Sequence, residues 1–229
     1  MIRSMQLNNR EGPVNVSRCL DYDQIATILR RDYYDDPVPH LSHRVIKTFA
    51  RNWIAARSQV YLMTAEADGT YAGFVFGHTL GPRFWRRFAT HHPNLLPALG
   101  WASLKMRLAA RTKLSAAKPP PNKSAGDDLE AEIAALEIST IPQPFAWAPE
   151  GSGAGLIPLL FVDPVHRGKG VAPHLLNRLS GDMFRDGAKV VEAHIDLQNF
   201  PSVRTFLKAG FEVYRMATND FWARKVKPD

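Results

Sequence analysis

The sequence contains little cysteine and no long apolar run. Cys19 is the only cysteine among 229 residues, so the chain cannot form an internal disulfide bond. No apolar stretch reaches the length that a membrane-spanning helix needs, and residues 1–15 lack the apolar middle region of a secretory signal. We therefore expect a cytoplasmic protein without a transmembrane segment, with Cys19 reduced.

Metal-ligand spacings and internal repeats are also missing. No Cys/His pattern typical of a zinc site occurs, so we expect no metal. Hydrophobic residues make up 45% of the chain, which is enough for a substantial core. The length suits one domain or one domain with an insertion. We expect a single domain over residues 1–229, with an insertion or lid at about 81–153, and either a monomer or a homodimer.

Positive charge exceeds negative charge. The 29 Lys and Arg residues against 22 Asp and Glu residues give a net charge of +7. This excess favours an anionic partner, although a solvated basic surface gives the same count. Residues 82–113 alternate aromatic residues with arginines, a pattern that fits base stacking or a lipid interface as well as helices packed on a core. We favour the last interpretation and expect no DNA or RNA partner.

Hydrophobic periodicity predicts a mixture of strands and helices. The expected strands cover residues 14–20, 60–66, 71–79, 156–162, 189–197, 211–216 and 221–226. The expected helices follow Asp21, cover residues 43–57 and 172–186, and run from Pro201 to Gly210. An antiparallel hairpin before a strand–helix–strand–helix unit argues for an α+β sheet, not for a doubly wound nucleotide-binding fold.

Residues 156–172, which read LIPLLFVDPVHRGKGVA, form the most informative segment. An apolar strand ends at Asp163-Pro164, and a short basic loop with two glycines leads into a helix. Such a loop turns backbone N–H groups toward an anion, and the start of the helix adds a partial positive charge. Arg167 and Lys169 add full charges. The segment therefore predicts a phosphate or pyrophosphate site at a strand-to-helix junction.

A second pattern lies downstream of this loop. After the helix and the next strand come Asn199, Ser202, Phe206 and Gly210-Phe211. Together with Arg167-Gly168-Lys169-Gly170-Val171-Ala172, which fits an Arg/Gln-x-x-Gly-x-Gly/Ala motif, this order resembles the GNAT superfamily of acetyl-CoA-dependent N-acetyltransferases. The resemblance is specific over about 155–216 and covers 14–79 by element order only.

The resemblance implies both a fold and a reaction. The fold would be a mixed, mostly antiparallel, twisted sheet flanked by helices, with a helical insertion. The reaction would be transfer of an acetyl group from acetyl-CoA, as co-substrate, to a primary amine of a small molecule by direct attack. Cys19 would then carry no acyl group. The basic insertion would suit an acceptor that bears phosphate or carboxylate. The alternative is a non-catalytic module of the same fold that binds acyl-CoA as a sensor or partner.

The resemblance also implies which residues would bind the cofactor. Residues 168–172 would offer N–H groups to the pyrophosphate. The strand at residues 160–162 would diverge from the next strand, and its exposed backbone would hold the pantetheine arm in the gap. Lys169 is equally explained as a solvated side chain, and Asn199 as the N-cap of a helix. The expected cofactor-binding residues are Leu160, Phe161, Val162, Arg167, Gly168, Lys169, Gly170, Val171, Ala172, Asn199, Ser202 and Phe206.

The catalytic residues follow less directly. Phe206 stands where many superfamily members carry a Tyr that reprotonates the leaving thiolate, so another acid, a water molecule or no dedicated acid would serve. His194 and Glu192 are the candidate general bases, because strand alternation places both on the face opposite Ala193 and Ile195. Packing or solvent exposure would explain these two residues equally. The acceptor pocket is expected to involve Tyr33, Tyr34, Asp35 and His40.

Overall fold

The computed structural model describes about half of the chain, and its residues cluster into two compact units. The described residues are 14–17, 22–32, 43, 46–47, 51, 60–79, 90, 93, 96–97, 100–101, 131, 133–136, 138–141, 153–196, 199–216 and 220–228. Unit 1 comprises Met1–Leu20, Trp53–Phe84 and Ser139–Asp229, and unit 2 comprises Asp21–Asn52 and Trp85–Ile138.

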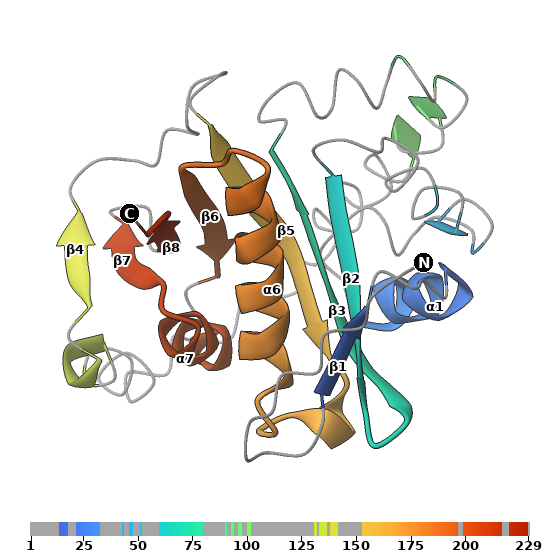
Figure 1. Cartoon of the computed structure of the whole chain (residues 1–229), viewed down its shortest axis with the longest axis horizontal. Coiled ribbons are helices and arrows are strands. Elements are labelled where there is room, and N and C mark those ends of the chain that lie inside the picture. The colour runs from blue at the N-terminus through green and yellow to red at the C-terminus, as the bar shows by residue number, and fades with distance from the viewer. Residues whose placement is uncertain are drawn as a thin grey trace, which may run out of the picture. The chain divides into compact units, whose positions relative to one another are not determined.

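Unit 1 contains one sheet of eight strands in the order β1-β2-β3-β5-β6-β8-β7-β4 (Figure 1). The strands are β1 (Val14–Ser17), β2 (Val60–Ala67), β3 (Thr70–His78), β4 (Ser139–Ile141), β5 (Ala154–Val162), β6 (Val190–Ile195), β7 (Glu212–Met216) and β8 (Phe221–Val226). The pairs β5–β6 and β4–β7 are parallel, and the other neighbouring pairs of this sheet are antiparallel. The expected mixed, mostly antiparallel α+β sheet is therefore confirmed. Residues 139–141 join this sheet although they fall within the range expected to be inserted.

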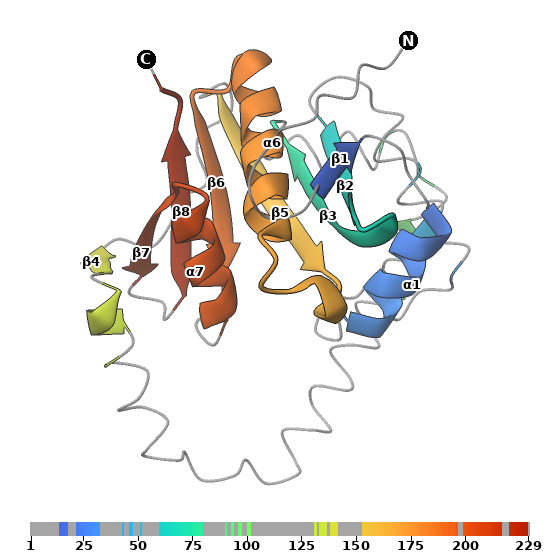
Figure 2. The same cartoon turned by 60° about the horizontal axis from the view of Figure 1, so that its bottom comes forward.

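Two helices, α6 (Val171–Arg185) and α7 (Phe200–Lys208), pack side by side on the sheet of unit 1 (Figures 1 and 2). α6 contacts β2, β3 and β5, whereas α7 contacts β7 and β8. The apolar stripe predicted for α6 is fully buried: Leu175, Leu176, Leu179 and Met183 are all at 0% exposure. Burying each such side chain contributes roughly 1.5–3 kcal/mol, so this stripe fixes the helix on the sheet.

Gly73 and Gly77 let β3 approach its neighbours closely. A Cβ atom on Gly73 would overlap the carbonyl oxygen of Phe161 in β5. A Cβ atom on Gly77 would lie 2.9 Å from the carbonyl oxygen of Leu156 and would overlap the Met183 side chain. The β3–β5 register also shifts between Phe76 and His78. Glycine inside this strand therefore marks both a close approach and an irregularity.

Unit 2 contains α1 (Tyr22–Asp32), the helix expected after Asp21. Residues 43, 46–47 and 51, which belong to the second predicted helix, are helical, as are residues 131 and 133–135. Ile25, Ala26 and Ile46 are buried. None of the helices that the structure describes is both long and apolar enough to span a bilayer.

Candidate functional site

The loop between β5 and α6 has the backbone form of an anion cradle. Gly168 and Gly170 adopt left-handed conformations with φ of +78° and +77°, on either side of Lys169. A Cβ atom at Gly168 would meet nothing within 4 Å, so glycine is needed there for its backbone angle and not for space. The short helix η3 (Pro164–His166) precedes the loop, and the Asp163 carboxylate caps it by accepting the Val165 N–H at 3.1 Å.

Five consecutive N–H groups, those of residues 168–172, lie at this junction. Among the described residues, none accepts a hydrogen bond from the N–H groups of residues 168–172, and no side chain caps α6 at Gly170. The first intrahelical bond runs from His174 N–H to the Gly170 carbonyl, and Pro173 has no N–H. The start of a helix also carries about half a positive charge, so these donors suit a bound anion.

The two basic side chains of the loop differ in their contacts. The Arg167 Nε donates to the Val162 carbonyl at 3.2 Å, which folds this side chain back onto the end of β5. The Lys169 Nζ lies 4.0 Å from the Asp68 carboxylate in the β2–β3 turn, and both side chains are largely exposed. An exposed pair at this distance contributes little to stability, so Lys169 can turn toward an anion at small cost.

β5 and β6 separate beyond their first three paired residues. They pair at Ala154–Val190, Gly155–Val191 and Leu156–Glu192 only, whereas β5 stays paired with β3 as far as Val162. Figure 2 shows the two strands diverging toward the end of β5 that leads into the anion cradle. The separation expected from the superfamily resemblance is therefore present in the sheet.

The register of β3 and β5 shows which β5 backbone groups face this separation. The Asp163 N–H donates to the Ala72 carbonyl at 2.9 Å, and antiparallel partners alternate between hydrogen-bonded and non-hydrogen-bonded pairs. Phe161 therefore turns its N–H and carbonyl groups toward β3, whereas Leu160 and Val162 turn theirs toward β6. Leu160 and Val162 therefore line the β6 side of β5, where the Arg167 Nε donates to the Val162 carbonyl, and the Phe161 side chain is buried beside Phe74.

α7 begins and packs as the second sequence pattern predicts. The Asn199 side chain accepts the Ser202 N–H at 3.2 Å, so Asn199 is the N-cap of this helix. Phe206 is 4% exposed and meets the Phe211 ring edge to face, with centroids 5.0 Å apart. Phe206 is therefore part of the core between α7 and β7, and its role beside a cofactor thiol stays a prediction.

His194 and Glu192 lie on the same face of β6 but in different surroundings. Glu192 is 7% exposed, its carboxylate lies 3.8 Å from the Arg224 Nε, and it accepts a hydrogen bond from Trp222. Burial raises the pKa of this carboxyl, and Arg224 and Trp222 oppose that shift. The His194 side chain is 52% exposed and lies 3.2 Å from Asp220. Of the two candidate bases, His194 is the accessible one.

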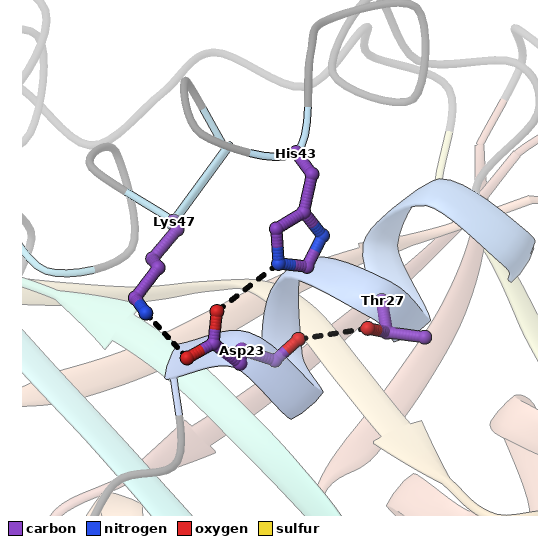
Figure 3. Close-up of polar contacts among 4 residues, drawn as sticks. All are labelled: Asp23, Thr27, His43 and Lys47. Atoms are coloured by element: carbon purple, nitrogen blue, oxygen red, sulfur yellow. Dashed lines mark hydrogen bonds and ion pairs between the residues drawn. The ribbon is translucent and has the colours of Figure 1, made fainter.

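A separate polar cluster lies in unit 2 (Figure 3). Asp23 of α1 accepts from His43 at 3.1 Å and from Lys47, and these two bonds lower the pKa of its carboxyl. The Thr27 hydroxyl donates to the Asp23 carbonyl at 2.8 Å within α1. These contacts connect α1 to His43 and Lys47. All three side chains are substantially exposed, so the contacts add little stability.

The structure does not describe the predicted acceptor-pocket residues. Tyr33, Tyr34, Asp35 and His40 lie outside the described residues, as does Cys19. Within the described ranges, no three His, Cys, Asp or Glu side chains come close enough to hold a metal ion.

Sequence reasoning did not single out Asp220. The sequence shows only that Asp220 directly precedes the last strand of the predicted closing hairpin. Pairing Phe221 of β8 with Ile195 of β6 brings Asp220 beside His194. That pairing depends on strand order, which local sequence does not specify.

Residues 129–211 match the model of the acetyltransferase (GNAT) family. A search of curated proteins found no match. Aminoglycoside acetyltransferase AAC(6')-Ib in complex with coenzyme A aligns with a TM-score of 0.50 at 12% identity, over 93% of this chain and 95% of that chain. An N-acetyltransferase from Staphylococcus aureus Mu50 aligns with a TM-score of 0.50 at 13% identity, over 93% of this chain and 98% of that chain.

Proposed function

We propose that the protein transfers an acetyl group from acetyl-CoA to a primary amine of a small molecule, because residues 129–211 match the model of the GNAT acetyltransferase family and the chain shares the fold of a known N-acetyltransferase. Acetyl transfer is the general activity of the family. The amine acceptor and the assignment of individual residues are our proposal.

The observation that carries the proposal is the run of N–H groups at residues 168–172 that no described residue accepts. A diphosphate offers many acceptor oxygens and negative charge, which such donors bind strongly. We assign the pyrophosphate of coenzyme A to this cradle and its pantetheine arm to the β5 edge formed by Leu160 and Val162. Asn199 and Ser202, at the start of α7, are further cofactor-binding residues of this proposal.

The reaction on this site is a direct transfer. His194 takes a proton from the ammonium group of the acceptor, and the neutral amine then attacks the thioester carbonyl. A C–N bond forms, the C–S bond breaks, and coenzyme A leaves as a thiolate. A backbone N–H of β5 near Leu160 stabilises the negative charge that develops on the carbonyl oxygen. The nitrogen loses its second proton as the amide forms. Because Phe206 has no proton to give, that proton reaches the thiolate through water, and the ordinary thiol pKa near 8.5 makes a dedicated acid unnecessary.

The acceptor class rests on two observations. AAC(6')-Ib, whose fold this chain shares, is also described in complex with paromomycin and acetyl-CoA. The accessible His194 lies on a sheet face with several carboxylates, which suits a cationic amine. The excess of Lys and Arg in the chain would also favour an acceptor that carries an anionic group in addition to its amine.

A single-turnover assay tests the proposal. Acetyl-CoA and a panel of primary amines are mixed with excess enzyme, and free coenzyme A thiol and acetylated amine are quantified together. We expect one thiol released for each amine acetylated, at an unchanged rate in Cys19→Ala. Complete loss of transfer in Cys19→Ala would overturn direct attack.

The alternative of a non-catalytic acyl-CoA-binding module has its own signature in the same assay. It predicts tight binding of acetyl-CoA with no thiol released in the presence of any amine. That result would overturn the proposed transfer activity but would still agree with the proposed acetyl-CoA-binding site.

A further inference from the structure

On the sheet face opposite α6 and α7, His194 begins a row of side chains that runs across three strands. Strand register places His194 beside Trp222 of β8, and Trp222 beside Tyr214 of β7. Side chains alternate along strands, so these residues share one face, whereas Val191 and Ala193 point to the helix-covered face. Trp222 is buried on this face, whereas the His194 side chain is 52% exposed, so His194 is the residue of this row that an acceptor can reach.

Asp220 is held at one end of this row by the β7–β8 hairpin. Its backbone carbonyl accepts the Met216 N–H at 2.8 Å, which fixes its place just before β8. Its carboxylate Oδ2 lies 3.2 Å from the His194 Nε2. The Asp220 side chain is 34% exposed, so the pair is partly shielded and still open to a substrate.

The other charged groups on this face have different partners. Glu192 contacts Arg224 and Trp222, and Glu212 accepts the Tyr214 hydroxyl at 2.6 Å, a bond that raises the pKa of that tyrosine. Asp196, beyond the end of β6, also has a partner of its own. Asp220 is thus the carboxylate that the structure pairs with His194.

We propose that Asp220 is a positioning residue that makes His194 the proton acceptor for the incoming amine. This inference rests on the proposed function. By accepting the Nε2–H of His194, Asp220 selects the tautomer whose Nδ1 carries a free lone pair. The acceptor ammonium loses a proton to Nδ1, an N–H bond breaks as an Nδ1–H bond forms, and the Asp220 carboxylate stabilises the resulting imidazolium.

Substitution of Asp220 tests the tautomer directly. In Asp220→Asn the side-chain amide can donate to Nε2, which moves the ring proton to Nδ1 and removes the lone pair from the amine side. We expect kcat/KM for the amine to fall roughly 10²-fold, with the KM for acetyl-CoA unchanged. His194→Ala should fall by a similar factor and recover in part with added imidazole, and the double variant should be no worse than His194→Ala.

The pH dependence separates this role from a merely structural one. A base is needed only while the acceptor is an ammonium ion, so the deficit of Asp220→Asn should shrink as the pH rises toward the pKa of the acceptor amine. The matched control is Asp186→Asn. In the wild-type protein, Asp186 directly follows the C-terminal end of α6, and its carboxylate accepts a hydrogen bond from the Tyr61 hydroxyl at 2.7 Å. This control should keep full activity.

Two outcomes distinguish the ways in which the inference can fail. If the wild-type protein transfers acetyl groups and Asp220→Asn keeps its kcat/KM, or loses it equally at every pH, Asp220 does not position a base. If the wild-type protein releases no coenzyme A thiol with any amine, the proposed function fails first.

Discussion

Glycine at position 73 allows the backbone of β3 to lie directly against β5 at the strand that borders the site. Any side chain there would meet the Phe161 carbonyl oxygen, which is rigid backbone. Phe161 lies between the two residues whose backbone groups face the separation of β5 and β6. A change at Gly73 therefore affects the strand that positions the proposed pantetheine contacts, although Gly73 itself touches no ligand.

Replacing Gly73 by Ala should destabilise the protein by roughly 1–3 kcal/mol, since β3 and β5 must move apart to admit the new methyl group. Chemical denaturation of both proteins measures the difference. The matched control is Gly181→Ala, because Gly181 lies inside α6 and an added Cβ atom there meets nothing within 4 Å. This control should gain about 0.5–1 kcal/mol from helix propensity. Equal stability of Gly73→Ala and the wild-type protein would contradict the close approach.

At the same scale, the sequence predicts the faces of side chains but not what surrounds them. Alternation correctly places Glu192 and His194 on one face of β6, yet only the fold shows that Glu192 is buried against Arg224 and Trp222. The partner of His194 lies 26 positions along the chain and is set by the pairing of β6 with β8. No local pattern contains that information.

At the scale of elements, α7 shows how local signals define a helix. Asn199 caps it, Pro201 lies in its first turn, and Gly210, with a φ of +76°, follows its end. Each of these residues acts within a few positions of itself, which is why the sequence predicts both ends of α7. Phe206 then fixes the packed face of the helix.

Asn199→Ala should lower stability by about 1 kcal/mol, because it removes the acceptor for the Ser202 N–H. Asn199→Asp keeps an acceptor oxygen and should retain most of that stability. Thermal denaturation of the three proteins compares them, and calorimetry with acetyl-CoA shows whether Asn199 also contacts the cofactor. An unchanged melting temperature in Asn199→Ala would contradict its role as N-cap.

The separation of β5 from β6 lies beyond such local reasoning. Residues 154–162 are uniformly apolar and indicate a buried strand, but nothing in them marks where pairing with β6 stops. The superfamily resemblance supplied that expectation, and the register confirms it. The sequence also could not predict the parallel edge strand β4, because a strand of three residues shows almost no hydrophobic periodicity.

At the scale of the whole molecule, two features favour an anionic ligand: the net positive charge and the N–H groups of residues 168–172. The excess of basic residues favours anionic ligands in general, whereas the proposed site assigns one anion, the pyrophosphate of coenzyme A, to the N–H groups of residues 168–172. Sequence reasoning predicted this place because strand, loop and helix start are contiguous in the chain. The acceptor pocket would be assembled from distant segments, and the sequence predicts it only through resemblance.

Isothermal titration of coenzyme A into the folded protein tests the central claim most directly. We expect one site per chain. We also expect Gly170→Glu to lose measurable binding, because its carboxylate would place a negative charge where the pyrophosphate binds. A circular dichroism spectrum equal to that of the wild-type protein establishes that this variant is folded. No heat with the wild-type protein, or undiminished affinity in folded Gly170→Glu, would contradict the assignment of the pyrophosphate to residues 168–172.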